Sequence, residues 1–181
     1  MLKEIDSLYA KSSLLYSAQD VQQSLDKMAK EIEEKIGDKN PIVVCVMTGG
    51  LVTLGHLMTR FNFHMQMDYV HASRYEGEMQ GGQLKWIARP RTELKGRTVL
   101  VVDDILDAGI TLAEIKKDFL AHGASEVYTA VLIDKIRSRP EEGLQQADFV
   151  GLNIEDHFIF GFGLDYKGYL RNTSGIYQVH Q

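Results

Sequence analysis

The stretch that decides the fold runs from Val99 to Leu112 and reads VLVVDDILDAGITL. Four apolar residues, typical of a buried strand, lead to the paired acids Asp103 and Asp104, and a third acid, Asp107, follows shortly after. A glycine turn then opens a pattern with helical period. Ligands of open parallel sheets bind beyond the carboxyl ends of the strands, so this order of strand, acidic loop, glycine turn and helix predicts a ligand site.

The same stretch holds two kinds of binding group. Adjacent carboxylates repel each other, so keeping both favours a partner that rewards negative charge, such as hydroxyl donors or a metal ion. The backbone N–H groups of Gly109 to Thr111 and the helix dipole can bind a phosphate. Alone, the acids would be a solvated turn and the glycine a plain helix cap, but their succession favours a sugar phosphate. Asp107, between the two groups, is a candidate general acid or base.

A second unit of the same kind precedes the first. Ile42 to Met47 is a nearly unbroken apolar run, as expected of a strand buried on both faces, and the turn Thr48 to Gly50 leads into another helical pattern. Two such units predict an α/β fold with a mostly parallel, twisted sheet flanked by helices and with both turns at the same edge. A capping-box variant at Ser17 predicts a further helix that ends at Gly37.

The remaining elements follow from shorter patterns. Further strands are expected over 65–73, 84–88, 127–133, 149–152 and 158–162, and the helix after the decisive stretch over 111–122. Residues 75–83 contain three glycines and few apolar anchors, which predicts a flexible hairpin loop.

Composition is that of an ordinary globular protein. The 181 residues and 44% hydrophobic content predict a single domain over 1–181. A net charge of −5 argues against nucleic-acid binding, which needs clustered Lys and Arg. The only cysteine, Cys45, lies in an apolar run, so it has no disulfide partner within the chain and is expected to pack in the core. With no apolar stretch of signal-peptide or membrane-spanning length, we expect a soluble, cytoplasmic protein without membrane contact.

Three motifs carry a family resemblance. Residues 99–111 resemble the signature of the type I phosphoribosyltransferases. The segment DHFIFGFGLDY, 156–166, is similar to the purine-binding segment of the hypoxanthine-guanine phosphoribosyltransferases, and DYVHASRY, 68–75, resembles the approach to that family's flexible active-site loop. The order of the three is highly specific. It implies the type I phosphoribosyltransferase fold, with a flexible active-site loop and a small hood formed by terminal segments.

The resemblance implies a purine-salvage enzyme. It would transfer the 5-phosphoribosyl group from phosphoribosyl pyrophosphate to hypoxanthine or guanine, giving IMP or GMP and pyrophosphate, with Mg²⁺ as cofactor and as a homodimer or homotetramer. Asp103 and Asp104 would hold the ribose hydroxyls, and Asp107 would lie near N7 of the purine. The 5-phosphate would be surrounded by Ala108, Gly109, Ile110 and Thr111.

The base and the pyrophosphate would have their own contacts. Lys135 would donate to the purine 6-oxo group, which favours a 6-oxopurine over adenine. Phe158 would stack on the base and the backbone of Ile159 would meet the ring edge, beside Asp165. The Mg²⁺ ion would be held by Asp165, Asp103 and Asp104. The pyrophosphate would contact Thr48, Gly49, Ser73, Tyr75 and Arg171, with the loop over 73–82 closing on the site.

Three departures from the family pattern stand out. The first turn has Met47-Thr48-Gly49 where the family usually has Leu-Lys-Gly, and whether Thr48 keeps the family's cis peptide is open. Ala108 stands where a hydroxyl residue is frequent, which removes one hydrogen bond to phosphate, worth about 1 kcal/mol. Arg74 stands where bacterial members often have serine, either contacting pyrophosphate or facing water.

Two other functions fit parts of the pattern. A response-regulator receiver also has paired acids at strand ends, but its pair belongs to the first strand. A non-catalytic regulator could keep this fold and sense phosphoribosyl pyrophosphate, but it would not need Asp107, Lys135, Phe158 and Asp165 together. Among enzymes, a relative that prefers xanthine remains an alternative.

Overall fold

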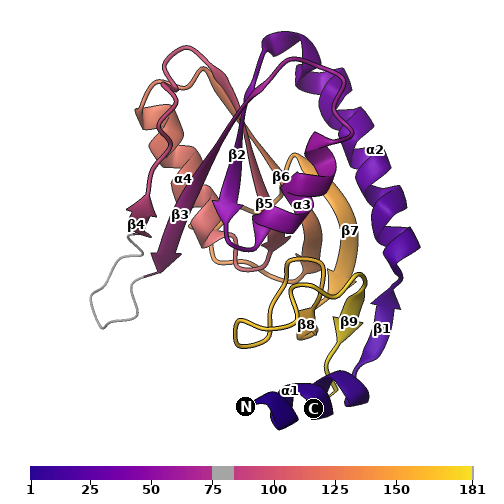
Figure 1. Cartoon of the computed structure of the whole chain (residues 1–181). Coiled ribbons are helices and arrows are strands. Elements are labelled where there is room, and N and C mark those ends of the chain that lie inside the picture. The colour runs from indigo at the N-terminus through magenta and orange to yellow at the C-terminus, as the bar shows by residue number, and fades with distance from the viewer. Residues whose placement is uncertain (75–83, 181) are drawn as a thin grey trace.

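A six-stranded sheet forms the centre of the protein, in the order β4-β3-β2-β5-β6-β7 (Figure 1). The computed structural model describes residues 1–74 and 84–180. The strands of the sheet are β2 (Ile42–Met47), β3 (Gln66–Arg74), β4 (Leu84–Ala88), β5 (Thr98–Leu106), β6 (Glu126–Ile136) and β7 (Phe149–Glu155). Neighbours pair in parallel except β3 and β4, which are antiparallel. The predicted mostly parallel sheet is confirmed.

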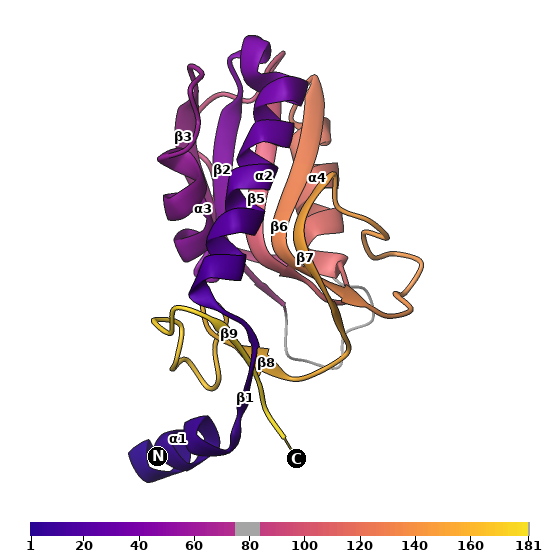
Figure 2. The same ribbon diagram turned by 90° about the vertical axis from the view of Figure 1, so that its right-hand side faces the viewer.

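Helices cover both faces of this sheet (Figure 2). Helices α2 (Ala18–Ile36) and α3 (Gly50–Met58) pack on one face, and α4 (Ile110–Ala121) packs on the other. Successive residues of β2 point to opposite faces, so Val43 belongs to the α2 and α3 core and Val44 to the α4 core. This explains the unbroken apolar run of β2. Burial raises the pKa of the Cys45 thiol to about 12, in keeping with a packing role.

Helix α2 begins and ends where the sequence predicts. The Asp20 N–H donates to Ser17 Oγ over 3.2 Å, and the Ser17 N–H donates to Asp20 Oδ2 over 2.8 Å, which completes the capping box. The helix stops at Gly37, where the short 3₁₀ turn η1 (Gly37–Lys39) leads toward β2. The two ends of α2 therefore lie where the sequence predicts them.

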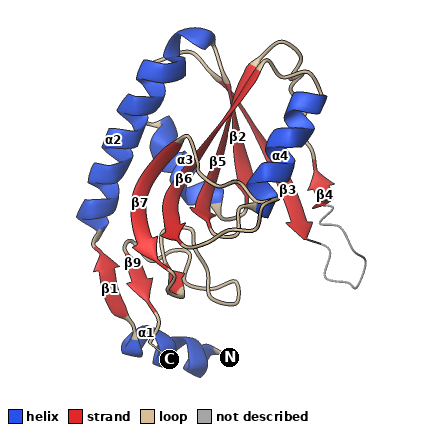
Figure 3. Cartoon of the chain, turned by 180° about the vertical axis from the view of Figure 1, so that it is seen from behind, coloured by secondary structure: helices blue, strands red, loops and turns tan. Residues whose placement is uncertain are grey.

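A small second sheet lies beyond the carboxyl ends of the parallel strands, and it forms the expected hood (Figures 1 and 3). It contains β1 (Ser13–Tyr16), β9 (Ile176–Gln178) and β8 (Ile159–Phe160), in the order β1-β9-β8. Helix α1 (Leu2–Lys11) lies against it, next to both chain ends. The patterns above did not predict α1, β1 or β9, and the strand expected over 158–162 is only the two residues of β8.

The acidic loop of the decisive stretch is a correction to the prediction. Asp103 and Asp104 lie inside β5, which continues to Leu106. The reason is unequal pairing: β2 pairs with β5 only as far as Val102, whereas β6 pairs with β5 as far as Leu106. The acids therefore sit on a strand that is hydrogen-bonded on one side and open on the other.

The other boundaries differ by a few residues. Strand β6 continues through Asp134 and Lys135, which were expected just after it, and α4 begins at Ile110. The loop expected over 75–83 lies outside the described residues, and the antiparallel strands β3 and β4 flank it. No helix in the described part of the chain combines the length and apolar character needed to cross a membrane.

Candidate active site

A cavity of about 360 Å³ separates the carboxyl edge of the main sheet from the hood. Its walls come from the turn after β2, from β5 and β6, and from the segment around β8. The cavity residues that the sequence predicted are Gly49, Asp103, Asp104, Thr111, Lys135, Phe158, Ile159, Asp165 and Arg171. The fold thus gathers nine of the candidates around one space.

A smaller cavity of about 160 Å³ adjoins the first one. It is lined by the turn from Asp107 to Gly109 and by Thr111. Asp103, Ile105 and Thr111 line both cavities. The two spaces therefore meet at Asp103 of β5, which suits an elongated ligand with a phosphate at one end.

The negative charges of Asp103 and Asp104 are unfavourable in the free site. Burial and the neighbouring Asp104 carboxylate raise the pKa of Asp103 well above its ordinary value. Burial also raises the pKa of Asp104. Partial relief comes from the Asp104 N–H, which donates to Asp103 Oδ1 over 2.9 Å, and from Arg171, whose Nη1 lies 3.9 Å from Asp104 Oδ2. Hydrogen-bond donors or a cation from a ligand would therefore stabilise the ionised pair.

The turn after β2 closes tightly on Asp104. A Cβ atom at Gly49 would lie 2.1 Å from Asp104 Oδ2, so any side chain there would displace the acid. The peptide bond between Met47 and Thr48 is cis, which answers the question left open by the sequence. Gly49 lines the large cavity with its backbone, whereas Thr48 is exposed and is not among the cavity residues.

The turn before α4 has the form of an anion site. Gly109 adopts φ +76°, and a Cβ atom there would lie 2.5 Å from the carbonyl oxygen of Leu144, so both conformation and space require glycine. No side chain in the described ranges caps α4. The first N–H groups of the helix therefore lack a side-chain partner among the described residues, and Gly109, Thr111 and Leu112 at this end line the smaller cavity.

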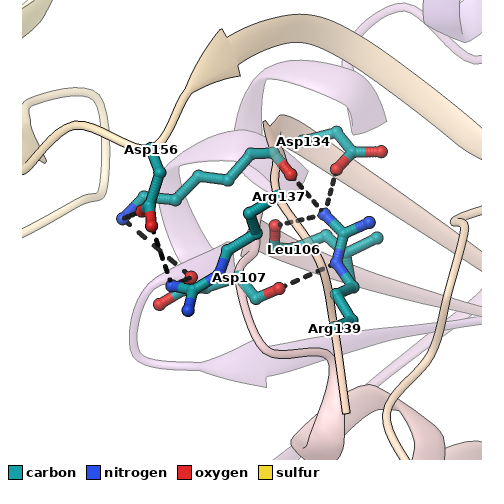
Figure 4. Close-up of polar contacts among 7 residues, drawn as sticks. Leu106, Asp107, Asp134, Arg137, Arg139 and Asp156 are labelled. Atoms are coloured by element: carbon teal, nitrogen blue, oxygen red, sulfur yellow. Dashed lines mark hydrogen bonds and ion pairs between the residues drawn. The ribbon is translucent and has the colours of Figure 1, made fainter. Parts of the chain in front are cut away.

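Two acids and two cations form a charged cluster at the ends of β5 and β6 (Figure 4). Lys135 Nζ lies 3.2 Å from Asp156 Oδ1 and 4.0 Å from Asp107 Oδ1. Arg137 Nη1 lies 2.9 Å from Asp107 Oδ1 and 3.3 Å from Asp156 Oδ2. Each cation thus serves both acids. Lys135 has only 12% of its side chain exposed, and it lines the large cavity.

The hood supplies an aromatic wall. Phe158 is 51% exposed and meets Tyr166 edge-on, with ring centroids 5.7 Å apart. Its half-exposed ring lines the large cavity, where an aromatic side chain can pack against a planar ligand. Ile159 follows as a buried residue at the start of β8 and also lines the cavity.

Asp165 and Arg171 form a pair at the rim of the cavity. Arg171 Nη2 lies 2.5 Å from Asp165 Oδ1, and its Nη1 donates to the carbonyl oxygen of Gly163. Asp165 Oδ2 accepts the N–H of Gly168 over 2.6 Å. Both carboxylate oxygens of Asp165 thus have a partner, and each keeps a second lone pair.

Two residues predicted to contact the pyrophosphate belong to the segment at and after the end of β3. Ser73 lies near the end of β3, and Tyr75 lies outside the described residues. Across 1–74 and 84–180, no group of three or more His, Cys, Asp or Glu side chains converges as a ready-made metal site.

Sequence reasoning missed three residues of the charged cluster and its support. Asp156 belongs to the motif over 156–166 but has no predicted role, and Arg137 and Arg139 follow the strand expected over 127–133 with no predicted role either. A pattern of charges does not show which acids they meet. The register of β5 with β6, in which Leu106 lies opposite Asp134, brings them together.

Comparisons with known proteins agree with this geometry. The family described as phosphoribosyl transferase domain matches residues 12–167. A hypoxanthine-guanine phosphoribosyltransferase of Aquifex aeolicus is 33% identical over 93% of this chain and 95% of its own length. The hypoxanthine-guanine-xanthine phosphoribosyltransferase of Tritrichomonas foetus is 30% identical over 90% of this chain and 88% of its own.

A solved structure supports the same conclusion. The hypoxanthine phosphoribosyltransferase of Trypanosoma cruzi, in complex with the product IMP, superposes with a TM-score of 0.84 and 25% identity, covering 92% of this chain and 93% of that one. Since the family match spans most of the chain, the protein belongs to the phosphoribosyl transferase family.

Proposed function

We propose that this chain transfers the 5-phosphoribosyl group of phosphoribosyl pyrophosphate to hypoxanthine and guanine, forming IMP or GMP and pyrophosphate in purine salvage. The observation that carries the proposal is the pair of adjoining cavities that meet at Asp103. The smaller cavity is lined by the turn before α4, which can bind an anion. The larger cavity is lined by the Lys135 side chain and by the exposed ring of Phe158. Such a site suits a sugar phosphate and a planar base side by side. The names of the relatives support the same substrates.

The sugar side uses β5 and the turn after it. Asp103 and Asp104 accept hydrogen bonds from the two ribose hydroxyls, which rewards the charge that burial penalises. The 5-phosphate occupies the smaller cavity, against the backbone of Ala108, Gly109, Ile110 and Thr111. Ala108 offers only its backbone, so the Thr111 hydroxyl is the side-chain donor of this turn.

The base side uses β6 and the hood. Lys135 donates to the 6-oxo group of the purine, Phe158 stacks on the ring, and Ile159 presents its backbone to the ring edge beside Asp165. Lys135 lines the cavity, and its ammonium donates to Asp156 over 3.2 Å. A donor at this place selects against adenine, whose 6-amino group is also a donor.

The departing pyrophosphate lies between the turn after β2 and the rim of the hood. Gly49 contacts it with its backbone and Arg171 with its charge. Thr48, Ser73 and Tyr75 are the other residues proposed to contact it. Arg171 is bonded to Asp165, which holds its guanidinium at the cavity.

Mg²⁺ fits the donor set as the cofactor. Asp103, Asp104 and Asp165 provide the hard carboxylate oxygens that this ion prefers, and Mg²⁺ commonly takes only one or two protein carboxylates together with substrate oxygens and water. The raised pKa of Asp103 and of Asp104 indicates that their charges lack sufficient compensation. When bound, the ion neutralises pyrophosphate charge.

The chemical step follows from these positions. The bond between ribose C1 and the pyrophosphate oxygen breaks with its electron pair on the oxygen, and a new bond forms between C1 and the purine nitrogen. Asp107 accepts the proton that the base loses. Arg171 and the backbone at Gly49 stabilise the negative charge that develops on the leaving group.

A regulator that only senses phosphoribosyl pyrophosphate is less well supported. Such a protein needs the acids of β5 and the phosphate turn, but no purine contacts. Lys135 and Phe158 both line the large cavity, and Asp107 lies within 4.0 Å of Lys135. These residues favour the enzyme.

Incubation with phosphoribosyl pyrophosphate, Mg²⁺ and one purine at a time tests the proposal. We expect nucleotide and pyrophosphate with hypoxanthine and guanine, and at least a hundredfold lower rates with adenine, because Lys135 then faces a second donor. Xanthine in a fourth reaction measures the alternative base preference. Separation of the products by chromatography gives the answer. Binding of phosphoribosyl pyrophosphate without product from any base would instead support the regulator.

We also propose a homodimer or homotetramer whose copies meet on an uncovered part of the main sheet. Met67 and Tyr69 on β3 and Ile87 on β4 are 47%, 41% and 57% exposed. Val70 and Trp86, which alternate with them, pack toward α4. The three exposed side chains therefore share the face opposite α4, beside α3, and a second copy would bury them.

Light scattering on a charged variant tests this arrangement. Tyr69→Glu should lower the mass of the particle, because it places a charge in an apolar contact. Leu120→Glu is the matched control, since Leu120 is 47% exposed on α4 at the opposite face. A monomeric wild type, or an equal effect of both variants, would contradict the proposed interface.

Two further parts of the proposal concern the chain as a whole. Residues 1–181 act as one domain, because the base contacts of the hood and the sugar contacts of the main sheet belong to a single site. The reaction takes place in the cytoplasm, since a substrate as highly charged as phosphoribosyl pyrophosphate does not cross a bilayer unaided.

A further inference from the structure

Arg139 lies just beyond the charged cluster and is bonded on every side (Figure 4). Its side chain is only 7% exposed. The guanidinium donates to the carboxylate of Asp134 and to four backbone carbonyl oxygens, those of Leu106 over 3.1 Å, Asp107 over 2.8 Å, Lys135 over 2.7 Å and Gln145 over 2.9 Å. The reaction proposed above gives Arg139 no role of its own.

Two of these carbonyls belong to the residues assigned to the purine. Backbone pairing between β5 and β6 ends where Leu106 lies opposite Asp134, so Asp107 lies beyond the last paired position of β5. There the Nε of Arg139 donates to the Asp107 carbonyl and the Nη2 donates to the Lys135 carbonyl. A planar, rigid guanidinium fixes the distance between two acceptors, which the single ammonium of lysine does not.

We propose that Arg139 is a positioning residue that sets the separation between Asp107 and Lys135. It thereby lets the two side chains contact N7 and the 6-oxo group of one base at the same time. This inference rests on the roles proposed above for Asp107 and Lys135. Arg139 itself is buried behind the backbone and acts through these two residues.

The sugar side of the site is held by other contacts. Asp103 and Asp104 belong to the paired part of β5. The phosphate turn has a contact that does not involve Arg139, because the Leu144 N–H donates to the Gly109 carbonyl over 3.1 Å. Loss of Arg139 should therefore weaken recognition of the base more than recognition of phosphoribosyl pyrophosphate.

Steady-state kinetics of Arg139→Lys tests the inference. We expect KM for hypoxanthine to rise about tenfold or more, while KM for phosphoribosyl pyrophosphate stays within about threefold. Two analogues give a second readout: 7-deazahypoxanthine lacks N7, and 6-mercaptopurine has a weaker acceptor at position 6. The preference of the wild type for hypoxanthine over each analogue should fall about tenfold in the variant. The reason is that misplaced Asp107 and Lys135 side chains no longer contact N7 and the 6-oxo group.

Arg97→Lys is the matched control. Arg97 precedes β5 at its other end, and its guanidinium also joins two segments, through Gln66 Oε1 over 2.6 Å and the Asn40 carbonyl over 2.8 Å. Its replacement should lower Tm without changing either KM or the preference for hypoxanthine. If Arg139→Lys does not fold, Asp134→Asn removes the acid bonded to Arg139 and should shift the same readouts in the same direction.

The outcomes separate this inference from the function beneath it. An active wild type with unchanged base KM and base preference in folded Arg139→Lys, or in folded Asp134→Asn when Arg139→Lys does not fold, overturns the positioning role alone. Equal losses for both substrates overturn it as well, because they indicate general damage. No nucleotide from the wild type, or full activity of Asp107→Asn and Lys135→Met, overturns the proposed base site and this inference together.

Discussion

Asp107→Asn should lower kcat by about 10²–10⁴, while the affinity for phosphoribosyl pyrophosphate changes by less than about threefold, because general acid–base catalysis contributes a factor of this size. Asparagine has the shape of aspartate but does not accept the proton of the base. Asp107 also lies outside the paired part of β5 that carries Asp103 and Asp104, so the sugar contacts stay in place. Steady-state kinetics gives kcat, and calorimetry gives the affinity.

Asp156→Asn is the matched control for this experiment. Asp156 contacts the same two cations as Asp107, with Lys135 at 3.2 Å and Arg137 at 3.3 Å. Its replacement removes the same charge from the cluster but no proton acceptor for the base, so kcat should fall less than about tenfold. Equal losses in both variants would mean that the charge of the cluster matters and not proton transfer. Lost sugar affinity in Asp107→Asn would mean that Asp107 holds the ribose.

Asp103→Asn should raise Tm by several degrees and abolish measurable binding of phosphoribosyl pyrophosphate. Burial and the Asp104 carboxylate raise the pKa of Asp103 in the folded protein, so its ionised form destabilises the fold. The amide removes this cost, and each kcal/mol corresponds to about 2–4 °C in a chain of this size. It also removes an acceptor for a ribose hydroxyl. Thermal unfolding and calorimetry without and with the substrate measure the two effects.

The pH dependence of this gain has a definite sign. The cost of ionised Asp103 is fully present above its raised folded pKa and disappears as the pH falls through that value toward the unfolded pKa of about 3.9. The Tm advantage of Asp103→Asn should therefore be larger at neutral pH than in acid, where it shrinks. A constant advantage across this range would contradict the assignment of the cost to ionisation.

Asp68→Asn is the control with the opposite sign. Burial opposes ionisation of Asp68 as well, but the N–H groups of Thr92, Tyr69 and Arg91 donate to its carboxylate and lower its pKa. Its charge therefore stabilises the fold above about pH 3.9, and this contribution is lost as the pH falls through the lowered folded pKa. At neutral pH its replacement should lower Tm, whereas Asp103→Asn raises it.

The main sheet was predictable because its signals are local. The apolar run of β2 reflects burial on both faces, and the capping box at Ser17 fixes the start of α2. Gly109 marks the turn before α4 because only glycine fits there. Each of these signals lies within a few consecutive residues, although the Leu144 carbonyl that leaves no room for a side chain at Gly109 comes from a distant part of the chain.

The features that escaped prediction depend on distant parts of the chain. Asp103 and Asp104 lie in a strand because β6 continues to pair with β5 after β2 has ended. Strand β1 forms only against β9, with Ser13 opposite Gln178. Arg139 bonds mainly to backbone carbonyls, which have no sequence signal and meet only in the folded chain.

The pairing of β1 with β9 also determines the order in which parts of the protein can form during synthesis. Chains leave the ribosome from the amino end, so Ser13–Tyr16 emerge early and wait for Ile176–Gln178. The last strand of the main sheet ends at Glu155, well before β9 is made. The central sheet can therefore assemble while translation continues, whereas the hood is complete only once β9 has been made. A nascent chain therefore completes the sugar contacts of β5 before the contacts that the hood makes with the purine.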